Sequence, residues 1–250
     1  MTASEIAETV GVSQPAVTRF VTNVLNFQGF SQFIKCIQDI IRYEVTGIER
    51  YQITSHKSTS AFEKLIKQEI DNLNNLLEDT TDEKLNQIVS VITNKKTIFL
   101  IGFRTAAPIV NYFFFFLRKI HPDVRICTHG GSEVYDTLHH MDRESTLIIT
   151  FIFPRYPTET INIIHYIQQE NFQSIAISDS FKLKEARICD IDIVTPIIIN
   201  TLFDSYTSTF FMLNILLDKI ARNNFAQTKE MLSTLEDMYH KNQIFYKRNN

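Results

Sequence analysis

The stretch "TIFLIGFRTAAPIVNYFFFFL", Thr97 to Leu117, decides the fold. It opens with a short apolar, β-branched run, passes a glycine, and continues as a helix-like segment. Four further apolar runs follow along the chain: "VRICTH", "TLIITFIF", "SIAISD" and "IDIVTP". Apolar runs of this kind, separated by helical stretches, are typical of parallel strands buried on both faces. The sequence therefore predicts an α/β domain in which helices flank a five-stranded parallel sheet.

Three loops of this predicted domain follow the first three strands, where open parallel sheets bind their ligands. "GFRTAA" and "FPRYPTET" each lead into a helix, whose N-terminal N–H groups attract anions, and each carries an arginine. "THGGSE" has two glycines that allow a tight turn. We predict a small-molecule pocket here, although ordinary structural turns with surface arginines are the alternative. The predicted ligand contacts are Gly102, Phe103, Arg104, Thr105, Ala106, Gly130, Gly131, Ser132, Arg155, Tyr156, Thr158, Glu159 and Thr160.

A different pattern stands at the start of the chain, in "TASEIAETVGVSQPAVTRF" from Thr2 to Phe20. Thr2 and Glu5 have the spacing of a capping box, and Gly11 suits a turn with positive φ. Ser13 is expected to cap a second helix that tolerates Pro15 in its first turn. The first helix is expected to present an apolar face of Ile6, Ala7 and Val10, and the second to bury Ala16, Val17, Phe20 and Val21.

The polar face of this second helix fits the major groove of DNA, as in a helix-turn-helix. A purely structural helical hairpin is the alternative. Residues 1–47 hold three basic and four acidic side chains, so one subunit would make few phosphate contacts and a dimer or larger oligomer is expected. The predicted DNA contacts are Ser13, Gln14, Pro15, Thr18, Arg19 and Asn23.

The rest of the chain divides by composition. We expect a DNA-binding domain at 1–46, a linker at 47–59 that includes the polar run "TSHKSTS", an α/β domain at 60–222 and a helical tail at 223–250. Two amphipathic helices precede the first strand, and a helix from about Leu202 to Arg222 follows the last one. The run "YFFFFL" is expected in the core or in a dimer interface.

Composition limits the function classes. The net charge of −3 gives no overall attraction to nucleic acid or anionic membranes, so any DNA contact must be local. Three cysteines far apart in sequence suit reduced thiols and a cytoplasmic protein. We expect no membrane partner, since no apolar run approaches the length of a membrane helix. We also expect no cofactor. No metal is expected either, because adjacent histidines such as His139 and His140 point in different directions on a helix and no cysteine supports them.

Taken together, the opening segment, the phenylalanine-rich "NFQGFSQF" and the later α/β domain resemble the RpiR family of bacterial transcription regulators. The resemblance implies an N-terminal helix-turn-helix that binds operator DNA. It also implies a three-layer α/β/α sugar isomerase (SIS) domain that binds an effector, usually a phosphorylated sugar. Family members carry one or two helices before the segment that begins here at Thr2, so we expect the DNA-binding domain to lack its first helix.

The predicted ligand loops depart from the family pattern at two places. Ala106 stands where members commonly have a serine, and "TFIFPRYPTET" replaces a Ser-x-Ser-Gly-x-Thr pattern, keeping only Glu159 and Thr160. The effector is therefore expected to be anionic and held by Arg104 and Arg155.

The sequence thus predicts a homodimeric or homotetrameric, non-enzymatic regulator that binds double-stranded operator DNA and a small anionic metabolite. Two other functions stay open. One is a phosphosugar isomerase or a non-catalytic sugar-phosphate-binding protein with a vestigial DNA-binding segment, with Glu133 or Glu159 as acid or base in the catalytic case. The other is a pure dimerisation module.

Overall fold

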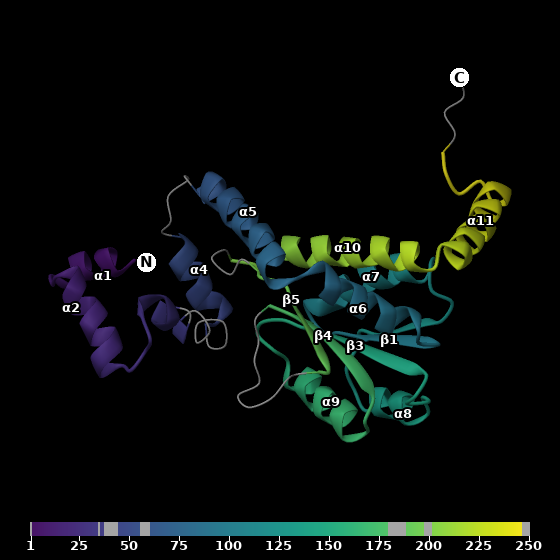
Figure 1. Cartoon of the computed structure of the whole chain (residues 1–250), viewed down its shortest axis with the longest axis horizontal. Helices are drawn as coiled ribbons and strands as arrows, with labels where there is room; N and C mark the ends of the chain where they lie inside the picture. The colour runs from purple at the N-terminus through teal and green to yellow at the C-terminus, as the bar shows by residue number, and fades with distance from the viewer. Residues whose placement is uncertain are drawn as a thin grey trace. The chain divides into compact units, whose positions relative to one another are not determined.

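A computed structural model of the chain describes residues 2–34, 36–37, 45–55, 61–179, 189–197 and 202–246. The chain divides into two compact units, Met1–Ile53 and Thr54–Asn250, whose elements are labelled in Figure 1. The elements of the N-terminal part are α1 (Ala3–Val10), α2 (Gln14–Arg19), the short π-helical continuation η1 (Phe20–Val24) and α4 (Gly47–Ser55). Residues 47–55, expected within a linker, are therefore helical, whereas 56–60 lie outside the described residues.

The helix pair at the start of the chain forms as its sequence signals predict. The Thr2 hydroxyl accepts from the Glu5 N–H, and the Glu5 carboxylate accepts from the Thr2 N–H, which confirms the capping box. Gly11 ends α1 with a φ of 69°, a left-handed conformation that glycine adopts without strain. Small apolar side chains allow α1 and α2 to pack closely, and the buried residues here are Ala3, Ala7, Val17 and Val21.

One local expectation for this unit was wrong. Phe20, expected to be buried, is 53% exposed, because the narrow contact between two short helices covers only the small side chains. Ser13 stands at the N-cap of α2, as expected, although its side chain makes no capping hydrogen bond. Phe30 from "NFQGFSQF" packs against the helix pair. Phe33 packs against Phe30, with the two ring centroids 6.0 Å apart.

The second unit is an α/β domain. Its elements are α5 (Ala61–Asp79), α6 (Asp82–Thr93), β1 (Thr97–Ile101), α7 (Ala106–Leu117), β2 (Val124–Cys127), α8 (Glu133–His139), β3 (Thr146–Ile152), α9 (Thr158–Gln169), β4 (Gln173–Ser178), β5 (Ile191–Val194), α10 (Thr207–Asn223) and α11 (Phe225–Lys241). All strand pairs are parallel and the strand order is β2-β1-β3-β4-β5, which confirms the predicted five-stranded parallel sheet.

Helices cover both faces of the sheet, which gives the predicted three layers. Helices α6, α7 and α10 lie over one face, and α8 and α9 lie over the other (Figure 1). Along β1 the side chains alternate between the two cores: Ile98 and Leu100 join the first, and Phe99 and Ile101 join the second. Every residue of β1 is buried, which explains why its sequence is continuously apolar instead of alternating.

The C-terminal helices differ slightly from expectation. Helix α10 begins at Thr207, not near Leu202, and Phe203 before it is 80% exposed. Of "YFFFFL" in α7, Phe113 and Leu117 are fully buried, whereas Phe115 is 54% exposed, so the run supplies core and surface together. Within the ranges that the structure describes, every helix is too short or too polar to cross a lipid bilayer.

Candidate functional site

The loops after β1, β2 and β3 meet at the carboxyl edge of the sheet. Strand β1 pairs with β2 on one side and with β3 on the other, so the strand order reverses between β1 and β3. Open α/β sheets bind ligands beside such a reversal, at the carboxyl ends of the strands. The backbone ties the first two loops together, since the Gly102 N–H donates to the Cys127 carbonyl at 3.1 Å.

Gly102 follows β1 directly, and its backbone lies so close to α7 that a side chain would not fit. A Cβ at this position would lie 2.7 Å from Val110 Cγ2, so even alanine would force a shift. Of the predicted ligand contacts in this loop, Phe103 and Ala106 point into the cores with 4% and 3% exposure. Their side chains are therefore structural, and Arg104 and Thr105 are the exposed groups that face solvent.

The second and third loops are joined by Glu159. Its carboxylate accepts a short hydrogen bond from the Gly131 N–H. A Cβ at Gly130 would lie 1.9 Å from Glu159 Oε2, so only glycine leaves room for this carboxylate. Gly131 has a φ of 132°, which other residues adopt only with strain. Ser132 is exposed and makes no side-chain capping bond to α8.

The third loop places polar groups at the N-terminus of α9. Thr160 lies in the first turn of this helix, only 1% exposed, and its hydroxyl has no hydrogen-bond partner. Arg155 and Thr158 are exposed nearby in sequence. Tyr156 turns inward, and its hydroxyl donates to both carboxylate oxygens of Asp179 at 2.9 Å. This buried pair links the third loop to the end of β4.

Tyr206, just before α10, connects the first and third loops. Its hydroxyl donates to Asp204 Oδ2 at 3.5 Å, and its ring meets the Phe153 ring edge-on with centroids 5.1 Å apart. Burial raises the pKa of Tyr206 to about 12, so the phenol stays protonated at neutral pH. The nearby Thr105 side chain of the first loop acts to lower the Tyr206 pKa. The sequence did not single out Tyr206, because it stands in the segment expected to be helical. Asp179 was also missed, although its place directly after a strand was an available signal.

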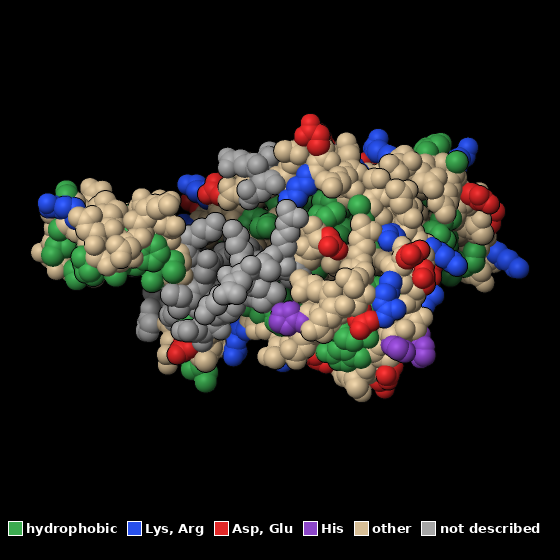
Figure 2. All heavy atoms as spheres, turned by 60° about the horizontal axis from the view of Figure 1, so that its bottom comes forward, with side chains coloured by type: hydrophobic (Ala, Val, Ile, Leu, Met, Phe, Trp, Pro, Cys, Tyr) green, Lys and Arg blue, Asp and Glu red, His purple; other side chains and the backbone are tan. Residues whose placement is uncertain are grey.

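The predicted DNA-contacting residues lie together on and beside α2. Ser13, Gln14 and Pro15 are exposed at its start, Arg19 is exposed at its end, and Thr18 is half-buried between them. Asn23 is exposed in η1. Charge elsewhere gives no basic stripe on the face in Figure 2, where Lys and Arg alternate with Asp and Glu.

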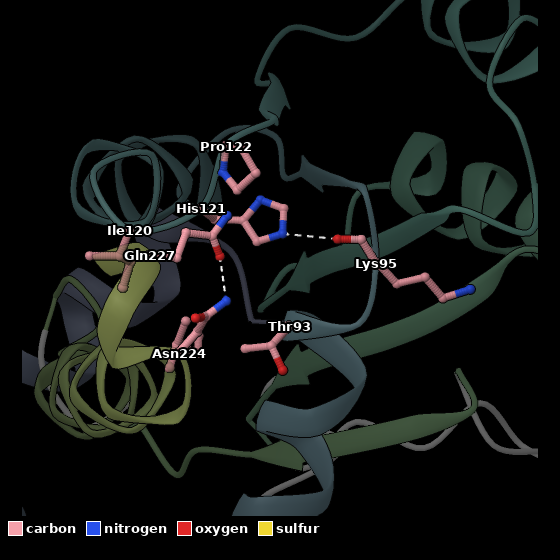
Figure 3. Close-up of a pocket in the computed structure, with 8 residues that line it drawn as sticks. Thr93, Lys95, Ile120, His121, Pro122, Asn224 and Gln227 are labelled. Atoms are coloured by element: carbon pink, nitrogen blue, oxygen red, sulfur yellow. Dashed lines mark hydrogen bonds between the residues drawn. The ribbon is translucent and has the colours of Figure 1, made fainter. Parts of the chain in front are cut away.

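Two further observations on the described residues concern metal ligands and a pocket away from the carboxyl edge. Among the described residues, no group of three His, Cys, Asp or Glu side chains could hold a metal ion. A pocket of about 110 Å³ lies at the opposite edge of the sheet, lined by Lys95, His121 and Asn224 among others (Figure 3). His121 Nε2 is 3.1 Å from the Lys95 carbonyl there, and burial lowers the His121 pKa, so the imidazole is neutral at pH 7.

The doubly covered parallel sheet with a polar carboxyl edge defines a three-layer α/β domain with a candidate ligand site. The family model described as SIS domain matches residues 91–219, just over half of the chain. The chain therefore belongs to the SIS domain family. The matched region holds all five strands and the three loops of the candidate site, and it does not extend to the N-terminal unit.

Solved structures share the fold at low sequence identity. The sugar isomerase domain of an RpiR transcription factor from Sphaerobacter thermophilus has a TM-score of 0.63 at 22% identity, covering 70% of this chain and 97% of its own. The NanR protein of Vibrio vulnificus, complexed with ManNAc-6P, has a TM-score of 0.60 at 10% identity, covering 96% of this chain and 86% of its own. No curated protein sequence matches significantly.

Proposed function

We propose that this chain is a cytoplasmic, RpiR-type transcription regulator. In this proposal the SIS domain binds a small anionic, phosphorylated sugar-like effector at the carboxyl edge, and the N-terminal helix-turn-helix binds operator DNA as part of a homodimer or homotetramer. The observation that carries the ligand half is Thr160, a buried hydroxyl without a partner at the N-terminus of α9.

A phosphate group suits this position for three reasons. The first-turn N–H groups of a 12-residue helix carry a partial positive charge. A buried hydroxyl without a partner costs free energy, and a phosphate oxygen would accept a hydrogen bond from it. Exposed Arg104 and Arg155 supply guanidinium groups from the first and third loops. The structures that share the fold include an RpiR domain and a NanR protein bound to ManNAc-6P, which supports this choice of ligand.

The proposal that the chain binds DNA rests on two observations: the exposed polar residues of α2, and the share of this chain that is similar in structure to NanR. Helix α2 exposes the polar residues Gln14 and Arg19, whose side chains are of the kinds that contact bases and phosphates. The likeness to NanR covers 96% of this chain and so includes most of the N-terminal unit. Paired recognition helices must match half-sites about one duplex turn apart, so an effector that changes their spacing would change DNA affinity.

Ligand sensing, not turnover, is the activity that we propose. The carboxylate of Glu159, which could have served as an acid or base, already accepts from the Gly131 N–H and so fixes a loop. Glu133 is exposed at the start of α8.

Ligand binding is tested by following heat denaturation of the full chain with a panel of hexose and N-acetylhexosamine 6-phosphates, each beside its free sugar. A phosphate-dependent rise in Tm is expected for the natural chain and for Thr160→Ser. Thr160→Ala should lose it, while Thr137→Ala on exposed α8 should keep it. Equal shifts with free sugars would contradict the phosphate site, and conversion between aldose and ketose phosphates by NMR would favour an isomerase.

DNA binding is tested by fluorescence anisotropy with the duplex upstream of the chain's own gene and with a random duplex. A salt-sensitive preference for the upstream duplex is expected. Arg19→Ala should weaken binding and reduce the salt slope by about one per subunit that contacts phosphate. The charge-matched control is Arg222→Ala, which removes an exposed arginine of α10. No preference for the upstream duplex at any salt concentration would refute the regulator proposal.

A further inference from the structure

Glu69 of α5 forms hydrogen bonds with the segment at the start of α10. Its Oε1 accepts a hydrogen bond from the Thr207 hydroxyl at 3.1 Å and a shorter one from the Ser205 hydroxyl. The two hydroxyls also lie 3.0 Å from each other. Glu69 thus joins a helix near the beginning of the domain to a segment 136 residues further along the chain.

The segment that Glu69 holds is the one that carries Tyr206. Tyr206 stands between Ser205 and Thr207. Its ring packs edge-on against Phe153 of the third loop, and Thr105 of the first loop lies near enough to influence its pKa. A movement of either loop on ligand binding would therefore shift the tyrosine and the two hydroxyls beside it. Tyr206, Ser205, Thr207 and Glu69 thus connect the carboxyl edge of the sheet to α5 through successive residues and hydrogen bonds.

The contact is incompletely satisfied in this structure. Glu69 Oε2 and Asn72 Nδ2 are both buried, and neither has a hydrogen-bond partner. Both residues belong to α5, three positions apart, and so lie on the same side of the helix. Because unpaired buried polar atoms are costly, a small shift of α5 against α10 that gives either atom a partner would be favourable.

We propose that Glu69 is a positioning residue that couples the carboxyl-edge ligand site to α5. This inference rests on the proposed function, because it takes an anion at that site as the input. The output is α5, the first described helix of the second unit, which follows the N-terminal unit in the chain. An anion that favours one arrangement of Tyr206 would favour one arrangement of α5 through Ser205, Thr207 and Glu69.

Amide hydrogen exchange of the full chain with and without saturating inorganic phosphate tests the coupling. In the natural chain, phosphate should slow exchange at 102–107 and 158–162, which reports binding, and should change exchange at 66–76 by about fivefold or more, which reports coupling. Glu69→Ala should keep the first effect and lose the second. Glu69→Gln, which retains an accepting oxygen, should keep both.

Two further variants separate coupling from loss of stability. Ser205→Ala combined with Thr207→Ala should behave as Glu69→Ala does, even if Glu69→Ala fails to fold. Glu63→Ala removes an exposed carboxylate from the same helix and should behave as the natural chain. Phosphate protection of the loops without any change at 66–76, or a change that persists in Glu69→Ala, would overturn the coupling alone. Absence of loop protection in the natural chain would overturn the phosphate site as well.

Discussion

The carboxylate of Glu159 occupies the space that a side chain at Gly130 would fill. A Cβ built on Gly130 would lie 1.9 Å from Glu159 Oε2, and the same carboxylate accepts from the neighbouring Gly131 N–H. The loop after β2 and the start of α9 therefore depend on each other, since the loop leaves room for the carboxylate and the carboxylate fixes the loop.

Gly130→Ala should therefore act through Glu159. The new methyl group displaces the carboxylate and breaks its bond to Gly131, so the free energy of unfolding should fall by about 1–2 kcal/mol. In a Glu159→Ala background the space is empty, and the same substitution should cost less than about 0.5 kcal/mol. Urea unfolding of the two single variants and the double variant measures this difference.

Gly131→Ala is the matched control for that cycle. Gly131 has open space around it but a φ of 132°, so alanine there is strained whatever Glu159 does. Its cost of about 1–3 kcal/mol should be the same in both backgrounds. If Gly130→Ala were equally costly with and without Glu159, the close approach would not be the reason for the glycine.

The pair of Tyr156 and Asp179 should stabilise the third loop. Tyr156→Phe removes a hydroxyl that donates to a carboxylate only 1% exposed, and we expect a loss of about 1–3 kcal/mol by urea unfolding. Tyr135→Phe is the control, because Tyr135 is half-buried against Tyr166 and its hydroxyl makes no hydrogen bond among the described contacts. It should change stability by no more than about 0.5 kcal/mol. Equal effects of the two substitutions would refute a specific role for the pair.

Asp123 should make stability depend on pH at the amino edge of the sheet. Hydrogen bonds from Arg125 and then from Thr97 hold the pKa of this carboxyl below its ordinary value of 3.8. Because the folded pKa is lowered, the ionised group stabilises the fold above pH 3.8, and this contribution is lost as pH falls through the lowered value.

Asp123→Asn is the comparison that isolates this group. The difference in urea midpoint between the natural chain and this variant should be constant at neutral pH and should shrink below pH 3.8. Arg125→Gln removes the main cause of the lowered pKa and should move the decline of stability to higher pH. A difference that does not change with pH would contradict the assigned role of the carboxylate.

The parts of the fold that the sequence predicted are those with a local pattern. Strands such as Thr97–Ile101 are fully buried and therefore continuously apolar, and the position of the candidate ligand loops follows from where the strands end. Glu69 and Tyr206 left no such signal. Their contacts join segments far apart in the chain, and Glu69 stands in an amphipathic helix where a carboxylate is ordinarily a solvent-facing group. Phe103 is a residue that the sequence predicted as a ligand contact but that the structure buries in the core.

Cys189 should resist alkylation in the native chain. It is 3% exposed among Ile152, Tyr156 and Ile164, and burial raises its pKa to about 11, so very little thiolate exists at pH 8. Cys127 is only half-buried, although burial raises its pKa as well, and it should react measurably in the folded state. Brief iodoacetamide pulses followed by peptide mass spectrometry should show Cys189 modified only at the rate of unfolding, and urea should accelerate it. Modification of Cys189 as fast as that of Cys127 without denaturant would show that this cluster opens in the native state.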